Sequence, residues 1–132
     1  YASYAQRHPE QLQIVGVADP MPLRREQTAA RFGLEPGQSH ASAEALAELP
    51  RQADFIINGT MDHQHVQTAL PLLRRGYDML LEKPFATSED DLWALVATAR
   101  QHQSNERLSV HDVFPAGSAA WDDAALRSRP VP

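Results

Sequence analysis

The sequence predicts an α/β fold, a doubly wound parallel sheet with helices on both faces. Three short apolar runs, each ending at polar or turn residues, read as buried strands. Helical patterns lie between them, and the crossovers are long enough to require parallel pairing. Because these strands are apolar on both sides, helices are expected to cover both faces of the sheet.

The first half of the chain alternates between helix and strand. The segment Leu-Gln-Ile-Val-Gly-Val-Ala is apolar and β-branched enough for a buried strand, and the helix after it stops at Gly33 in the C′ position. The elements expected here are a helix over 1–7, a strand over 12–18, a helix over 22–32, a loop with room for one short strand over 34–42, and a helix over 43–49.

The second half continues the same alternation. Apolar residues recur at spacings of three and four in two helices, of which the first contains Pro71 and ends at Gly76. The last helix begins at Thr87 or Ser88 as N-cap, followed by three acidic residues. The expected elements are a strand over 54–58, a helix over 66–75, a strand over 79–81, a helix ending near 102, a last strand over 108–114, and an irregular tail over 115–132.

The amino-acid composition excludes several kinds of protein and of functional site. The 132 residues include 42% hydrophobic and 22% charged residues, which is typical of a soluble globular domain. Net charge is −5 without an extended basic cluster, so nucleic-acid binding is not supported. The absence of cysteine excludes disulfides, thiolate metal sites and a cysteine nucleophile. No apolar run approaches a membrane span and no signal-peptide pattern is present, so a cytoplasmic location is expected.

The strongest candidate for chemistry is Lys83, in the segment Glu-Lys-Pro at 82–84. It directly follows a predicted strand, and in open α/β sheets ligands bind outside the carboxyl ends of the strands. Lys83 is the only lysine in the chain, and burial can shift the pKa of an ammonium whereas a guanidinium stays charged. The alternative is a surface lysine at this position by chance.

Asp19 and Thr60 also follow predicted strands. A carboxylate at the position of Asp19 accepts hydrogen bonds from ribose hydroxyls in dinucleotide folds, although Asp19-Pro20 is also a common turn. Because Asp19, Thr60 and Lys83 all follow parallel strands, we expect them along one edge of the sheet. The segment Asp-His-Gln-His at 62–65 invites a metal site, but a third ligand is not evident. We therefore expect no metal, and we interpret these histidines as a polar cluster that is either structural or faces a cofactor.

Three segments together resemble the Gfo/Idh/MocA family of nicotinamide-dependent oxidoreductases. The first is Val-Gly-Val-Ala-Asp at 15–19. The second is Thr-Met-Asp-His-Gln-His at 60–65, where the family has Thr-Pro-Asn-x-x-His. The third is Gly-Tyr-Asp-Met-Leu-Leu-Glu-Lys-Pro at 76–84, where the family has Gly-Lys-His-Val-x-x-Glu-Lys-Pro. The resemblance covers residues 1–103, and the spacing between the last two segments also agrees.

This resemblance implies a Rossmann-like dinucleotide-binding domain over 1–114 and an NAD cofactor, with NADP as the alternative. It implies that Lys83 is the catalytic-site lysine beside the nicotinamide and the substrate hydroxyl. Lys83 and Glu82 would contact the cofactor, and Asp19, Thr60 and His65 would lie on the cofactor side. The implied reaction is hydride transfer between the nicotinamide and a sugar or polyol-type hydroxyl. The intact protein would bind the dinucleotide and a small-molecule substrate, and a homo-oligomer is one expected form.

The chain also departs from the family pattern. Met61 and Asp62 stand where the family has Pro and Asn. No Gly-x-Gly-x-x-Gly segment occurs, so the first strand and its phosphate-binding loop are missing. The resemblance fades after His102, and the second, substrate-binding domain is absent. We therefore expect a truncated fragment that is inactive by itself.

In the doubly wound order 3-2-1-4-5-6, the missing strand would lie between the strand that ends at Asp19 and the one that ends at Asn58. Two alternatives to the oxidoreductase fragment remain open. One is a non-catalytic nucleotide-binding or regulatory module, and the other is an inactive relic.

Overall fold

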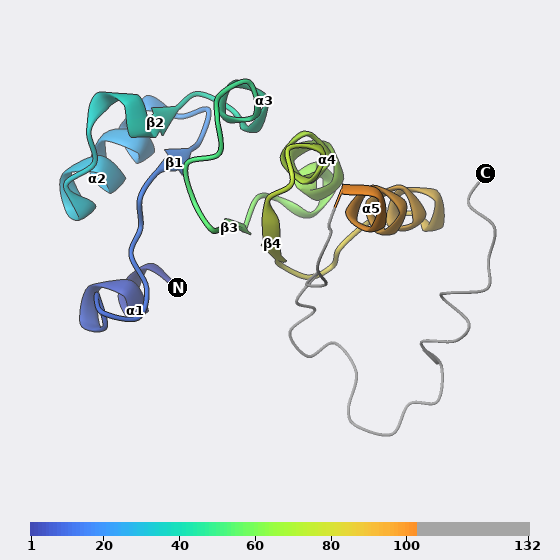
Figure 1. The fold of residues 1–132 in the computed structure, drawn as a ribbon, viewed down its shortest axis with the longest axis horizontal. Coiled ribbons are helices and arrows are strands. Elements are labelled where there is room, and N and C mark those ends of the chain that lie inside the picture. The colour runs from blue at the N-terminus through green and yellow to red at the C-terminus, as the bar shows by residue number, and fades with distance from the viewer. Residues whose placement is uncertain (103–132) are drawn as a thin grey trace.

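The computed structural model describes residues 1–102, so the strand expected over 108–114 and the tail over 115–132 lie outside the described residues. Helices and parallel strands alternate through the described part (Figure 1). The helices are α1 (Ala2–Arg7), α2 (Pro22–Phe32), α3 (Ala43–Ala47), α4 (His65–Arg74) and α5 (Glu89–His102), with short 3₁₀ helices η1 (Pro36–Gln38) and η2 (Asp62–Gln64). The strands are β1 (Val17–Ala18), β2 (Ser39–His40), β3 (Phe55–Asn58) and β4 (Asp78–Leu81).

The described strands form two separate parallel pairs. β1 pairs with β2, and β3 pairs with β4. Within residues 1–102 no strand joins β1 to β3, and Figure 1 shows the two pairs apart. In the doubly wound order, the two pairs would read β2, β1, an open position, β3, β4, because no strand among residues 1–102 joins β1 to β3. The predicted α/β fold with parallel strands is confirmed, and the strand expected to be missing between β1 and β3 stays a prediction.

The strand expected over 12–18 is much shorter in the structure. β1 comprises only Val17 and Ala18, because its partner β2 is itself two residues long. Residues 12–16 have no regular structure, and their apolar side chains are only half-buried. A central strand needs a neighbour on each side, and here one side of β1 is open.

The predicted helix ends are largely confirmed. Gly33 and Gly76 follow α2 and α4 with φ of 65° and 77°, a conformation that glycine adopts at little cost. The hydroxyl oxygen of Ser88 accepts a hydrogen bond from the Asp91 N–H at 3.2 Å. Ser88, rather than Thr87, therefore caps the start of α5.

α4 runs through Pro71 without ending there. Proline removes one intrahelical hydrogen bond, whose acceptor would be the carbonyl of Gln67. Gln67 is exposed, so water can replace the lost donor. The proline therefore costs some stability but leaves the helix continuous.

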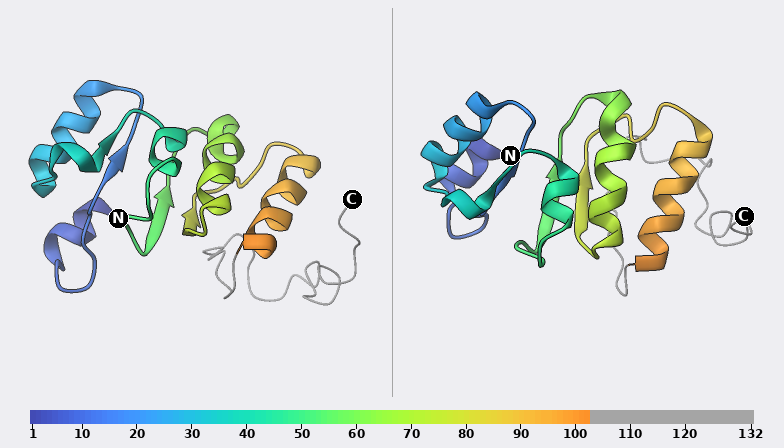
Figure 2. Two further views of the ribbon diagram at one scale, coloured as in Figure 1. Left: turned by 45° about the horizontal axis from the view of Figure 1, so that its top comes forward. Right: turned by 90° about the horizontal axis from the view of Figure 1, so that it is seen from above.

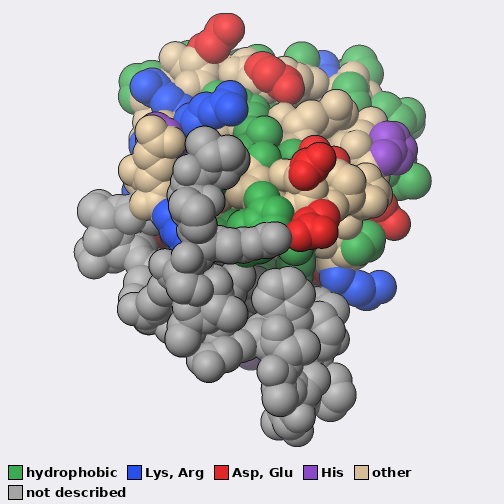
Figure 3. Space-filling model, turned by 90° about the vertical axis from the view of Figure 1, so that its right-hand side faces the viewer, with side chains coloured by type: hydrophobic (Ala, Val, Ile, Leu, Met, Phe, Trp, Pro, Cys, Tyr) green, Lys and Arg blue, Asp and Glu red, His purple; other side chains and the backbone are tan. Residues whose placement is uncertain are grey.

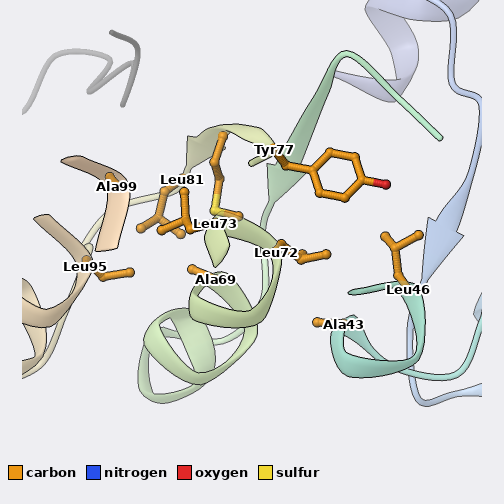
Figure 4. Packing of buried hydrophobic residues seen from close by; sticks show 10 residues of the cluster. Ala43, Leu46, Ala69, Leu72, Leu73, Tyr77, Leu81, Leu95 and Ala99 are labelled. Atoms are coloured by element: carbon orange, nitrogen blue, oxygen red, sulfur yellow. The ribbon is translucent and has the colours of Figure 1, made fainter. Parts of the chain in front are cut away.

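The hydrophobic core lies between β4 and a row of three helices. In the right-hand view of Figure 2, α3, α4 and α5 lie side by side with α4 in the middle. Leu73 and Tyr77 are fully buried there, and Figure 4 shows how the core side chains converge from these elements. The buried cluster consists of Ala43, Leu46, Ala69, Leu72, Leu73, Tyr77, Met79, Leu81, Leu95 and Ala99.

The β3–β4 pair is covered on one face. Met79 and Leu81 of β4 are buried in the core, whereas the alternate residues Asp78 and Leu80 are only half-buried. Phe55 of β3 is 40% exposed. The expectation of helices on both faces is therefore met on only one face of this pair within the described residues.

The N-terminal half is sparsely packed. α2 lies against β1 and β2 yet buries none of its residues, and Leu23 is 59% exposed. All members of the buried cluster lie between Ala43 and Ala99. The core therefore belongs to the part of the chain that contains β3, β4 and the three helices beside them.

No helix among residues 1–102 is long and apolar enough to cross a membrane. On the face shown in Figure 3, acidic and basic side chains are interspersed among the described residues. No patch of a single charge dominates what these residues expose there.

Candidate functional site

The carboxyl ends of β3 and β4 meet because the two strands are parallel and in register. Asn58, the last residue of β3, pairs with Leu81, the last residue of β4. The pairing extends one residue further, because the N–H of Glu82 donates to the carbonyl oxygen of Asn58 at 3.0 Å. The turn that contains Thr60 and the segment that contains Lys83 therefore lie side by side.

Lys83 is exposed at this edge of the sheet. Among residues 1–102, no hydrogen bond or ion pair holds its ammonium. The peptide bond that joins it to Pro84 is cis. The backbone fixes only the point from which the Lys83 side chain extends, and no group among residues 1–102 engages the three donors of its ammonium.

A polar network beneath the turn after β3 was not predicted. Asn58 is 4% exposed, and its Oδ1 accepts hydrogen bonds from the N–H and the hydroxyl of Thr60 at 3.3 and 2.9 Å. Its Nδ2 donates to Oγ1 of Thr68 at 3.0 Å. Because the Thr60 hydroxyl donates inward, it offers a ligand its oxygen lone pairs. The available signal was an asparagine that ends an otherwise apolar strand.

His65, the first residue of α4, is 1% exposed. Its Nδ1 lies 2.7 Å from the carbonyl oxygen of Pro84, and its Nε2 lies 2.9 Å from the carbonyl oxygen of Thr60. The ring therefore sits between the two turns, and both nitrogens face backbone oxygens. Its expected place on the cofactor side remains a prediction.

Glu82 is half-buried and lies next to Gly59. Hydrogen bonding to the Glu82 carboxylate is the largest cause that raises the pKa of Tyr1 above its ordinary value. Desolvation and the negative charge of Glu82 raise the Tyr1 pKa further. Glu82 thus places a carboxylate at the edge where a cofactor contact is expected.

Asp19 follows β1 and belongs to the other strand pair. Its Oδ1 accepts a hydrogen bond from the N–H of Met21 at 2.8 Å, which forms the turn into α2. Its Oδ2 lies 3.6 Å from Nη1 of Arg24, and Arg25 donates to its carbonyl oxygen at 2.6 Å. The turn that the sequence suggested is therefore present, and an arginine accompanies the carboxylate.

The structure brings four of the five predicted site residues together. Thr60, His65, Glu82 and Lys83 lie at the carboxyl ends of β3 and β4. Asp19 follows β1, in the pair that no strand among residues 1–102 joins to β3, so its expected place on one edge with Thr60 and Lys83 stays a prediction. Within residues 1–102, no group of three or more His, Cys, Asp or Glu side chains is placed to hold a metal ion.

Solved structures with a similar fold are oxidoreductases. The WlbA dehydrogenase from Chromobacterium violaceum, solved with NADH and UDP-GlcNAcA, is 23% identical with a TM-score of 0.68, over 76% of this chain and 28% of that one. The WlbA dehydrogenase from Bordetella pertussis, solved with the same two ligands, is 20% identical with a TM-score of 0.68 and the same coverage. An oxidoreductase from Agrobacterium radiobacter, solved with NAD⁺, L-tartaric acid and magnesium, is 25% identical with a TM-score of 0.59, over 67% of this chain and 25% of that one.

The chain thus spans about a quarter of the length of these structures. A search of curated proteins found no match. Among protein families, the oxidoreductase family with an NAD-binding Rossmann fold, Gfo/Idh/MocA, matches residues 1–110. This match covers most of the chain, and the parallel strands with their adjoining turns agree with it. The chain therefore belongs to the Gfo/Idh/MocA oxidoreductase family, in its NAD-binding Rossmann domain.

Proposed function

We propose that this chain is part of an NAD(P)-dependent oxidoreductase that transfers a hydride between nicotinamide and a sugar or polyol-type hydroxyl. The observation that carries this proposal is the exposed Lys83 beside the Thr60 turn, at the carboxyl ends of two parallel strands and without a partner among residues 1–102. The family match and the NAD⁺ in the Agrobacterium radiobacter structure support the choice of cofactor.

The chemistry divides between cofactor and protein. A bound nicotinamide supplies the hydride acceptor or donor. Lys83 is suited to donate a hydrogen bond to the substrate oxygen and to polarise or relay the hydroxyl proton as the hydride leaves. No internal ion pair among the described residues has to break before Lys83 engages the substrate.

Asp19, Thr60 and Glu82 serve cofactor binding in this proposal. Asp19 would accept hydrogen bonds from the adenosine ribose hydroxyls through the carboxylate oxygens that also hold the turn. Glu82 and Thr60 present acceptor oxygens on the adjoining edge of β3 and β4. These groups suit hydroxyl and amide donors of a dinucleotide.

We also propose that a strand outside these 132 residues fills the open position between β1 and β3. Within residues 1–102, each of these strands pairs on one side only, and α2 buries none of its residues. A parallel strand followed by a glycine-rich turn would complete the sheet and would place a pyrophosphate on a helix N-terminus. The chain has no Gly-x-Gly-x-x-Gly segment. This absence favours a non-catalytic role for the 132 residues by themselves, and not for a longer protein that supplies such a segment.

The test is turnover in a longer version of the protein that includes the neighbouring coding sequence. Reduction of NAD⁺ is followed by absorbance with a panel of sugars and polyols. Replacing Lys83→Arg should lower kcat at least about tenfold with cofactor affinity little changed, because a guanidinium stays protonated and has a different shape. Arg74→Lys, an exposed change at the end of α4, is the matched control. Parental activity in Lys83→Arg would contradict the proposed role.

A further inference from the structure

We propose that His65 is a positioning residue that holds Lys83 in place through the backbone of Pro84. The kinetic consequences of this inference rest on the proposed function, because they require the oxidoreductase reaction. Its structural basis is the placement of one buried imidazole between two turns that carry the site.

The two ring contacts join turns that follow different strands. Nε2 faces the carbonyl oxygen of Thr60, after β3, and Nδ1 faces that of Pro84, after β4. Each distance is of hydrogen-bond length, and each partner is an acceptor, so the ring donates wherever it carries a proton. His65 is 1% exposed, so both ring contacts form away from bulk water, where losing a hydrogen-bond partner is costly.

Among residues 1–102, only the backbone constrains the point from which the Lys83 side chain extends. No side-chain hydrogen bond or ion pair within residues 1–102 holds its ammonium. Among the described residues, His65 makes the one side-chain hydrogen bond to the backbone of Glu82–Pro84. Pro84 directly follows Lys83 in the chain, so the ring holds the residue next to the one from which the lysine side chain extends.

His65 is itself held firmly. It begins α4, and its carbonyl oxygen accepts hydrogen bonds from Oγ1 of Thr68 at 3.1 Å and from Nδ2 of Asn58 at 3.4 Å. Asn58 in turn binds Thr60. The network therefore links the start of the helix, the end of β3 and the turn that carries Lys83.

Two substitutions separate the two ring contacts. The amide nitrogen of asparagine lies as many bonds from Cα as Nδ1 of histidine, so His65→Asn can keep the contact with Pro84. The amide nitrogen of glutamine corresponds in the same way to Nε2, so His65→Gln can keep the contact with Thr60. If His65 acts through Pro84, Lys83 should be disturbed in His65→Gln and not in His65→Asn.

The structural readout does not require activity. In a longer version of the protein, lysines are converted to ¹³C-dimethyl-lysine, and the Lys83 signal is assigned by its loss in Lys83→Arg. We expect its chemical shift or line width to change in His65→Gln and to match the parent in His65→Asn and in the exposed control His102→Gln. Equal spectra in the two His65 variants, whether both changed or both unchanged, would overturn the inference.

The kinetic readout separates positioning from general stability. We expect kcat to fall at least about tenfold in His65→Gln and less than about threefold in His65→Asn, with the KM for NAD nearly constant in both. A merely structural role would lower kcat in both variants in step with their melting temperatures. If the parent turns over no hydroxyl substrate, the proposed function fails, and the Lys83 signal still decides the positioning role.

Discussion

Replacing Leu73→Ala should destabilise the chain strongly, because Leu73 is fully buried at the centre of the core. The change removes three side-chain carbons, worth about 2.4 kcal/mol at roughly 0.8 kcal/mol per buried methylene. The cavity that remains between α4 and its neighbours raises the expected loss in unfolding free energy to about 3 to 5 kcal/mol. A domain of this size has roughly 5 to 15 kcal/mol in total, so a large part of its stability is at stake.

Urea unfolding followed by circular dichroism measures this loss. With a slope of about 1 kcal/mol per molar urea, the midpoint should fall by about 3 M or more, or the folded baseline should disappear. Leu23→Ala is the matched control, because Leu23 is 59% exposed and the same atoms are removed. We expect it to change the unfolding free energy by less than about 1 kcal/mol. A loss of similar size in both variants would refute the description of the core.

Two further predictions concern the cofactor. The 132-residue chain alone should neither turn over substrate nor bind NAD tightly, because no strand in the described part joins β1 to β3 and the sequence has no Gly-x-Gly-x-x-Gly loop. Calorimetric titration checks this, and cooperative unfolding together with micromolar binding would count against it. A longer version should prefer NAD to NADP, since the Asp19 carboxylate repels a ribose 2′-phosphate, although Arg24 at 3.6 Å weakens that repulsion. Asp19→Ala should lower the NAD-to-NADP ratio of kcat/KM by about tenfold, and a clear NADP preference in the parent would contradict the prediction.

Local signals in the sequence predicted the elements well. Gly33 marked the end of α2, Ser88 was one of two proposed caps of α5, and β2 lies in the loop that had room for a short strand. These features depend on a few adjacent residues. The strand expected over 12–18 was too long because its length depends on neighbouring strands.

The sequence also predicted the site only in part, because local signals locate strand ends but not the contacts that form when distant elements pack together. Strand ends located Thr60 and Lys83, and parallel pairing then brought them together. The roles of Asn58 and Thr68 were missed because their contacts arise only when α4 packs over the end of β3. Sequence spacing also could not tell that both nitrogens of His65 would face backbone carbonyls from different turns.

The open position between the two strand pairs has a consequence for how the chain unfolds. The buried cluster lies wholly between Ala43 and Ala99, and α2 contributes nothing buried. Local opening of α1, β1, α2 and β2 therefore exposes little apolar surface, whereas opening of β3, β4 and α4 exposes the core. Amide hydrogen exchange should accordingly divide the chain into a fast unit before Ala43 and a slower unit after it, with Asp19 in the fast unit and Lys83 at the rim of the slow one.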